Sequence, residues 1–157
     1  MSDTLERSAL SLVDPELAAR LTSHIRGEFP QLPEGYPERI LEQALAYLKA
    51  CAGSPGSVLS PSPLVDIGWH TFILHSREYS EFCDEVAGHF IHHVPENESN
   101  PPPGDPDEIR RRTMKAIEEC GYRVDPELWA SLDHKCKGGG GPGGPGGGCH
   151  QGCHDSA

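Results

Sequence analysis

The chain has 157 residues, a formal net charge of −11 and a sequence pI near 5.2. Its length suits one domain with a single buried core. The acidic balance leaves no basic face for phosphate groups, so nucleic acids and anionic membrane surfaces are not expected partners. No stretch approaches the roughly 20 apolar residues that span a bilayer, and the first six residues lack the features of a secretory signal. We therefore expect a cytoplasmic protein.

Helix signals dominate the sequence. An Asp-Pro-acid triplet occurs three times, which places an N-cap, a proline at the first helical position and a first-turn carboxylate together, at Asp14, Asp105 and Asp125. After the first triplet, an apolar residue recurs at every fourth position as far as Phe29, which predicts an amphipathic helix of about four turns. A second helix is predicted from about Pro37 to Cys51, before a run of glycine, serine and proline.

The next predicted element begins at Ser62-Pro63 and is apolar on most of its circumference, which indicates a central, buried helix. Around Ser76 it either continues or restarts. A further apolar stripe then runs from Tyr79 to Phe90, and we expect this helix to end near His93, with His89, His92 and His93 clustered at its end.

Beyond the proline-rich linker 95–104, a fourth major helix is predicted up to Cys120 and closed by Gly121, followed by a short last helix. Residues 138–148 are all Gly or Pro and cannot contribute to a core. No strand alternation or solenoid repeat is present. The sequence thus predicts an all-α fold, an irregular bundle of about five helices in residues 1–135, with a disordered, flexible tail in residues 136–157.

Chemistry-bearing residues concentrate between Asp66 and His93, where five of the nine histidines fall. On a helix, Asp66 and His70 lie four residues apart on one face, where the carboxylate can bind the imidazole. Such a pair suits a general acid/base or the outer shell of a metal-bound histidine. Two structural explanations compete: Asp66 can favour a helix N-terminus, and histidines at a C-terminus can remain solvated.

The spacing of Asp66, Trp69-His70, Tyr79, Cys83 and Gly88 with a following His93 resembles the signature of the glycine-rich-domain-containing protein-like family. The resemblance covers the middle third of the chain, and the Gly/Cys-rich tail matches it. It implies a helical domain and, by analogy with small bacterial relatives, a role in specialised-metabolite biosynthesis. Many relatives carry a second histidine where this chain has Phe72, which weighs against a His-x-His metal site here.

The leading hypothesis is a small, cofactor-free acid/base enzyme of the dehydratase or cyclase type, a lyase or isomerase acting on a small-molecule substrate. No phosphate loop, nucleophile elbow or dinucleotide fingerprint is present. Proton transfer needs only a base, an acid and oriented binding. The expected catalytic residues are Asp66, His70, Tyr79 and His93, and the expected substrate-binding residues are Trp69, Phe72, Ile73 and His75.

The alternative is a zinc- or copper-binding or protein-interaction module without catalysis, which uses the histidine cluster or the tail. The tail offers thiolate and imidazole ligands suited to these metals, at Cys136, Cys149, His150, Cys153 and His154. Their spacing is not that of a standard zinc finger, so a solvated, disordered tail is the competing explanation. A scaffold without chemistry is a third possibility, and the sequence leaves the oligomeric state open.

Overall fold

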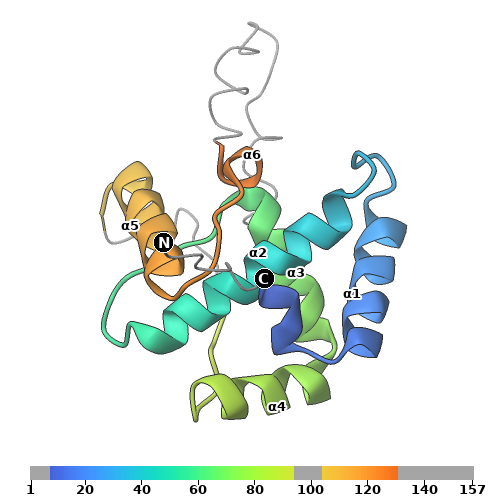
Figure 1. The fold of residues 1–157 in the computed structure, drawn as a ribbon, viewed down its shortest axis with the longest axis horizontal. Coiled ribbons are helices and arrows are strands. Elements are labelled where there is room, and N and C mark those ends of the chain that lie inside the picture. The colour runs from blue at the N-terminus through green and yellow to red at the C-terminus, as the bar shows by residue number, and fades with distance from the viewer. Residues whose placement is uncertain (1–7, 94–103, 131–157) are drawn as a thin grey trace, which may run out of the picture.

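The computed structural model describes residues 8–93 and 104–130 (Figure 1). Within these residues it is helical and has no strand, which confirms the all-α prediction. The elements are a short 3-10 helix η1 (Ala9–Leu12) and the α-helices α1 (Pro15–Glu28), α2 (Tyr36–Gly53), α3 (Pro63–Leu74), α4 (Ser76–Val86), α5 (Pro106–Glu119) and α6 (Pro126–Trp129). None of the described helices is long and apolar enough to cross a membrane.

Helix α2 is the centre of the bundle. It runs diagonally through the middle of the molecule, with α1 on one side and α5 on the other (Figure 1). Its apolar residues are almost completely buried, among them Ile40, Leu41, Leu45 and Leu48. Burial on this scale explains why α2 holds the surrounding helices together, because apolar area removed from water is the main stabilising contribution.

Helices α2 and α3 approach each other closely at Gly68. A Cβ atom at this position would lie 2.8 Å from the Cβ atom of Ala44 and 3.0 Å from the carbonyl oxygen of Ile40. The absence of a side chain therefore lets the two backbones pack together. This contact fixes the position of α3, which carries Asp66, Trp69 and His70.

The three helix starts predicted from Asp-Pro triplets are confirmed in position, but their expected capping hydrogen bonds are not formed. Asp14, Asp105 and Asp125 occupy N-cap positions before a proline, yet none of their side chains makes a capping hydrogen bond. Asp125 instead binds Arg39 through both carboxylate oxygens, at 2.7 and 2.8 Å. Ser62, by contrast, caps α3 by accepting a hydrogen bond from the Val65 amide.

The central segment restarts rather than continues. His75 has a non-helical backbone (φ −91°, ψ 66°) and separates α3 from α4. After α4, Gly88 adopts a positive φ of 76° and its amide bonds to the Cys83 carbonyl, which closes the helix. The prediction that His89, His92 and His93 end this helix is therefore wrong: they follow it, in a segment that returns toward α3.

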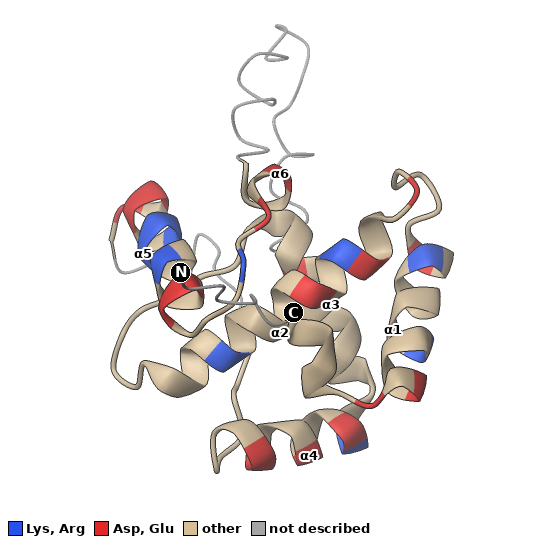
Figure 2. Cartoon of the chain, viewed as in Figure 1, with Lys and Arg blue, Asp and Glu red and all other residues tan. Residues whose placement is uncertain are grey.

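Charge is distributed unevenly over the helices. Figure 2 shows acidic and basic residues on α1, α4 and α5, whereas α3 carries one charged residue, Asp66. This residue is only 4% exposed. A buried carboxylate needs partners, because removing a charge from water is otherwise very costly.

Candidate functional site

The Asp66 carboxylate pairs with His93. The Nε2 atom of His93 lies 2.7 Å from Oδ1 of Asp66, and the side chains are 9% and 6% exposed. The predicted partner on the same helix, His70, instead has its ring beside that of His93. The sequence prediction of an Asp66/His70 pair is corrected on this point, because the segment that returns toward α3 brings His93 to the carboxylate.

Tyr79 holds the returning segment in place. Its hydroxyl donates a hydrogen bond to the Ile91 carbonyl and accepts one from Nε1 of Trp69 at 2.9 Å. The side chain is completely buried. Burial also raises the pKa of Tyr79, so the hydroxyl stays protonated and can donate. Both bonds are made inside the protein, so Tyr79, which the sequence analysis placed among the catalytic residues, holds the segment that carries His93.

Trp69 forms one wall around His93. The two ring centroids are 4.2 Å apart with an interplanar angle of 47°, and Trp69 is 6% exposed. On its other side Trp69 packs against Tyr47 of α2, with centroids 5.1 Å apart. Its ring nitrogen already bonds to Tyr79, so Trp69 fixes the orientation of the histidine and offers little surface to a substrate.

One nitrogen of His93 has no partner among the described residues. An ionised carboxylate can only accept a hydrogen bond, so Nε2 of His93 carries the proton shared with Asp66. In the neutral ring the other nitrogen, Nδ1, then holds a free lone pair. This atom is buried and, within the described part of the chain, has no hydrogen-bond partner. An unpaired buried polar atom costs roughly 1–3 kcal/mol, so it calls for an explanation.

His70 lies beside this histidine. Its ring centroid is 6.3 Å from that of His93, with the rings nearly perpendicular. Its side chain is half-buried, whereas Asp66 and Trp69 are buried. The structure thus brings together three of the four predicted catalytic residues, Asp66, His70 and His93, with Tyr79 in support.

The predicted substrate-binding residues are divided. Phe72 is fully buried and packs against Tyr79 and Phe82 with ring centroids 5.2 Å apart, so in the structure it is a core residue, and its substrate role stays a prediction. Ile73 is half-buried and packs against the core. His75 lies at the α3–α4 junction and contacts a different helix.

The partner of His75 is His24 of α1, which the sequence analysis did not single out. Nδ1 of His24 lies 3.0 Å from Nε2 of His75, and Nε2 of His24 lies 3.1 Å from Oε1 of Glu28. Burial, followed by the nearby charge of His24, lowers the pKa of His75 and favours its neutral ring. No sequence signal links two histidines that are 51 positions apart.

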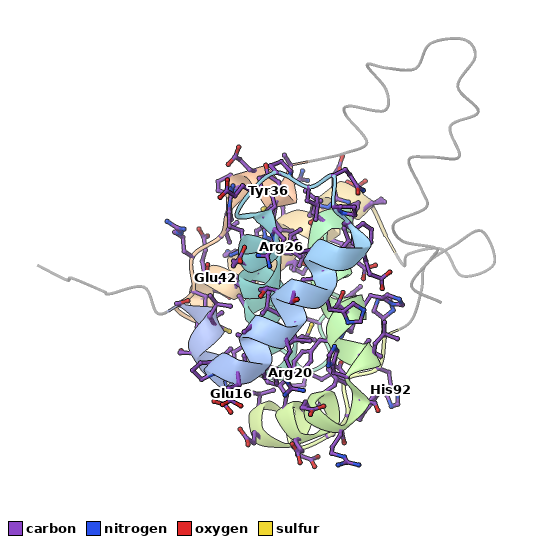
Figure 3. All side chains as sticks on the ribbon, turned by 90° about the vertical axis from the view of Figure 1, so that its right-hand side faces the viewer. Glu16, Arg20, Arg26, Tyr36, Glu42 and His92 are labelled. Carbon is purple, nitrogen blue, oxygen red and sulfur yellow. The ribbon has the colours of Figure 1, made fainter. Side chains whose placement is uncertain are left out.

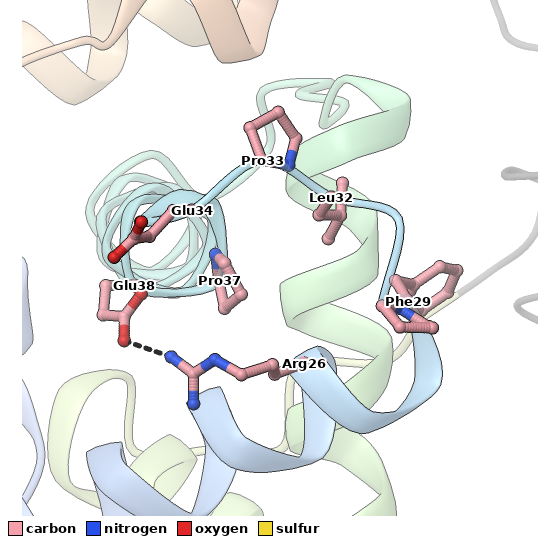
Figure 4. Close-up of a pocket in the computed structure, with 9 residues that line it drawn as sticks. Arg26, Phe29, Leu32, Pro33, Glu34, Pro37 and Glu38 are labelled. Carbon is pink, nitrogen blue, oxygen red and sulfur yellow. Dashed lines mark hydrogen bonds and ion pairs between the residues drawn. The ribbon is translucent and has the colours of Figure 1, made fainter.

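A surface hollow of about 620 Å³ lies elsewhere, at the turn between α1 and α2 (Figure 4). Arg26 and Glu38 form an ion pair across it, with 2.5 Å between Nη2 and Oε2. Its other lining residues are mainly prolines and apolar side chains, and none of the predicted site residues contributes. The hollow is therefore separate from the Asp66–His93 pair.

The tail carries the predicted metal ligands. The predicted zinc or copper ligands, Cys136, Cys149, His150, Cys153 and His154, lie outside the described residues. Within residues 8–93 and 104–130, no group of three or more His, Cys, Asp or Glu side chains is arranged to hold a metal ion.

Comparison with known proteins gives a family but no activity. The model of the UCP032817-like family matches residues 8–127, so the chain belongs to this family. No curated protein and no solved structure matches the chain. The family match covers every residue of the Asp66–His93 neighbourhood, and it does not test the resemblance to the glycine-rich-domain-containing protein-like family, which stays a prediction.

Proposed function

We propose that this member of the UCP032817-like family is a small acid/base enzyme of the lyase or isomerase type, with the Asp66–His93 pair as its proton-transfer centre. The observation that carries the proposal is the buried, unpaired Nδ1 atom of His93, whose opposite nitrogen is held by Asp66 at 2.7 Å. A lone pair kept away from water and oriented by a carboxylate has the properties of a general base.

Each neighbour has a distinct role in this proposal. Asp66 fixes the tautomer of His93 and stabilises the imidazolium that forms when Nδ1 accepts a proton. His70, at a ring distance of 6.3 Å, returns a proton to the product. Trp69 and Tyr79 limit the movement of His93 through the ring contact and the bond to Ile91. Catalysis of this kind needs precise placement more than a cofactor.

The substrate class follows from charge and from the base. The chain has a formal net charge of −11, and α3 carries no Lys or Arg, so a polyanionic substrate such as a phosphate ester is disfavoured. A general base acts on an acidic C–H or O–H bond. We therefore expect a small carbonyl compound, from which a proton is abstracted next to the carbonyl group before water is eliminated or a bond is formed. By the same analogy as above, specialised-metabolite biosynthesis is the expected context.

The test measures proton exchange with solvent. A panel of small keto acids, β-hydroxy ketones and enones is incubated with the full chain in D₂O, and loss of the C–H signal next to the carbonyl is followed by ¹H NMR. We expect exchange above the buffer rate for at least one compound and loss of this exchange in His93→Ala. We expect retention in His89→Ala, whose exposed side chain bonds to the nearby Ala87 carbonyl. Equal exchange in His93→Ala and the wild type, or none across the panel, would contradict the proposal.

Metal binding is the second candidate for the same histidine. A carboxylate that holds one imidazole nitrogen while the other is free is also the arrangement that orients a metal-binding histidine. Zinc or copper would then bind at Nδ1 of His93, either with His70 or with the Cys/His-rich tail. If exchange activity survives removal of metal by a chelator, the acid/base enzyme is favoured. If the wild type shows no exchange activity but binds a metal ion that His93→Ala does not bind, the metal-binding module is favoured.

A further inference from the structure

The His24–His75 pair is a second, independent cluster of imidazoles. It lies where α1 meets the junction of α3 and α4, and it shares no residue with the Asp66–His93 pair. The ring centroids of His24 and His75 are 5.2 Å apart, and the facing nitrogens are separated by 3.0 Å. Both side chains are half-buried, so solvent reaches the pair.

The two nitrogens form a hydrogen bond in this structure, and their separation of 3.0 Å is also compatible with two ligands on one metal ion. Bonds of about 2.1 Å that meet at a right angle place two imidazole nitrogens about 3.0 Å apart. A right angle between neighbouring ligands is typical of square-planar and octahedral ions, such as Cu(II) and Ni(II). A tetrahedral ion needs a wider separation.

Glu28 supplies the outer shell of such a site. It accepts from Nε2 of His24 at 3.1 Å, which leaves Nδ1 of His24 directed at His75. A carboxylate on the far nitrogen of a metal-binding histidine fixes its tautomer and increases its basicity. The same residue therefore prepares His24 as a ligand while it remains outside the first coordination shell.

Backbone hydrogen bonds and a nearby ion pair hold the two histidines in place. The amide of His75 donates to the Phe72 carbonyl and its carbonyl accepts from the Tyr79 amide, both at 2.9 Å. Arg20 of α1 and Glu78 of α4 approach to 3.7 Å next to the pair, so an ion pair spans the same junction. Figure 3 shows Arg20 at the end of α1 that lies closest to α4. Two imidazoles fixed in this way lose little freedom when they bind an ion.

We propose that His24 and His75 form a binding site for a divalent late transition-metal ion of the Ni(II) or Cu(II) type, with Glu28 hydrogen-bonded to His24 and water in the remaining coordination positions. Two protein ligands make this an exchangeable site, open to solvent. It shares no residue with the cysteine-rich tail or with the Asp66–His93 pair.

The test uses Ni²⁺ and the full chain, with the thiols kept reduced. Bound nickel per chain is measured after equilibrium dialysis for the wild type, His24→Gln, His75→Gln and, as a matched control, His89→Ala. Ligands in the tail contribute equally to all four proteins. We expect the wild type and His89→Ala to bind one ion more than either glutamine variant, and Glu28→Ala to bind the same ion about 10–100-fold more weakly.

Glutamine keeps a hydrogen-bonding group at each position, and circular dichroism and thermal unfolding verify that the variants remain folded. If the glutamine variants bind as much nickel as the wild type, the contact is a histidine–histidine hydrogen bond only and the proposal fails. An equal loss in His89→Ala would likewise overturn it, since the binding would not be specific to the pair. Neither result bears on proton exchange at His93.

Discussion

The bundle contains two buried polar networks, and they differ in whether every buried side-chain atom has a hydrogen-bond partner. The first joins α2 to α6: Gln43 donates to the Arg123 carbonyl at 2.9 Å and accepts from the Asp125 amide and from Nε1 of Trp129, at 3.1 and 2.7 Å. The second joins Asp66, His93, Trp69 and Tyr79.

Among the described residues, no buried side-chain atom of the Gln43 network lacks a partner, whereas Nδ1 of His93 does. A fully paired network contributes to stability and specifies the packing of its helices. In the second network, one buried atom without a hydrogen-bond partner lowers the stability of the fold. We therefore expect chemistry or a ligand at this atom. The contrast gives five predictions, from the largest expected effect to the smallest.

The largest effect is expected at the free atom itself. His93→Ala should reduce proton exchange, where a reactive carbonyl compound has been found, by about 100-fold or more, because the general base is lost. The free energy of unfolding should fall as well, because the variant leaves the buried Asp66 carboxylate without this partner, so exchange is compared per folded molecule. A melting temperature that falls strongly while the remaining folded protein keeps its full exchange rate would assign His93 to structure.

The paired network should respond in the opposite way. Gln43→Ala leaves the Asp125 amide and the Trp129 ring nitrogen without their acceptor, and we expect a loss of about 3 kcal/mol in the free energy of unfolding. Urea unfolding followed by circular dichroism measures it. Exchange per folded molecule should be unchanged, so a parallel loss of activity would show that the two networks are coupled.

The position of α3 can be tested at Gly68. Gly68→Ala introduces a methyl group within 2.8 Å of Ala44, and should destabilise the protein by about 1–3 kcal/mol despite the better helix propensity of alanine. Adding Ala44→Gly should restore part of the loss. Gly27→Ala is the matched control, since nothing lies within 4 Å of its added Cβ atom, and should stabilise by about 0.5–1 kcal/mol. Equal effects at both glycines would contradict the close approach of α2 and α3.

Tyr79 should influence both stability and activity. Tyr79→Phe removes the acceptor for Trp69 and the donor to Ile91, and should cost about 1–2 kcal/mol in the free energy of unfolding. Because the segment that carries His93 is then less firmly held, kcat should fall while KM changes little. If only stability changes, Tyr79 is a core residue with no positioning role.

The smallest effect concerns pH. The Arg39 guanidinium holds the pKa of Asp125 below its usual range, so the ion pair stabilises the fold above the unfolded value of about 4 and loses its contribution as the pH falls below it. Asp125→Asn should therefore cost about 1 kcal/mol at pH 7, and the difference from the wild type should shrink below about pH 4. Asp84→Asn, at an exposed position on α4, serves as the control. A difference that is independent of pH would show that the charge of Asp125 does not matter.

Helices and their starts were predictable from the sequence. The spacing of apolar residues located α1 to α5, and the Asp-Pro triplets located three helix starts, because both signals arise within a few residues along the chain. The sequence did not decide whether the helix breaks at Ser76, and the predicted end of α4 near His93 is wrong, because α4 ends at Val86. Gly88 was a visible signal for that end, but the apolar stripe that continues to Phe90 outweighed it.

Most residues of the candidate site could also be predicted from the sequence, but which of them pair could not. Asp66, His70, Tyr79 and His93 could be singled out from residue type and spacing, whereas the choice of His93 over His70 as the partner of Asp66 depended on the chain reversal after α4. Likewise, His24 could not be connected to His75. By itself the sequence determined which side chains were available, since propensity and periodicity are local. Only the tertiary structure decided which of them meet, because contacts between distant segments depend on how the helices pack.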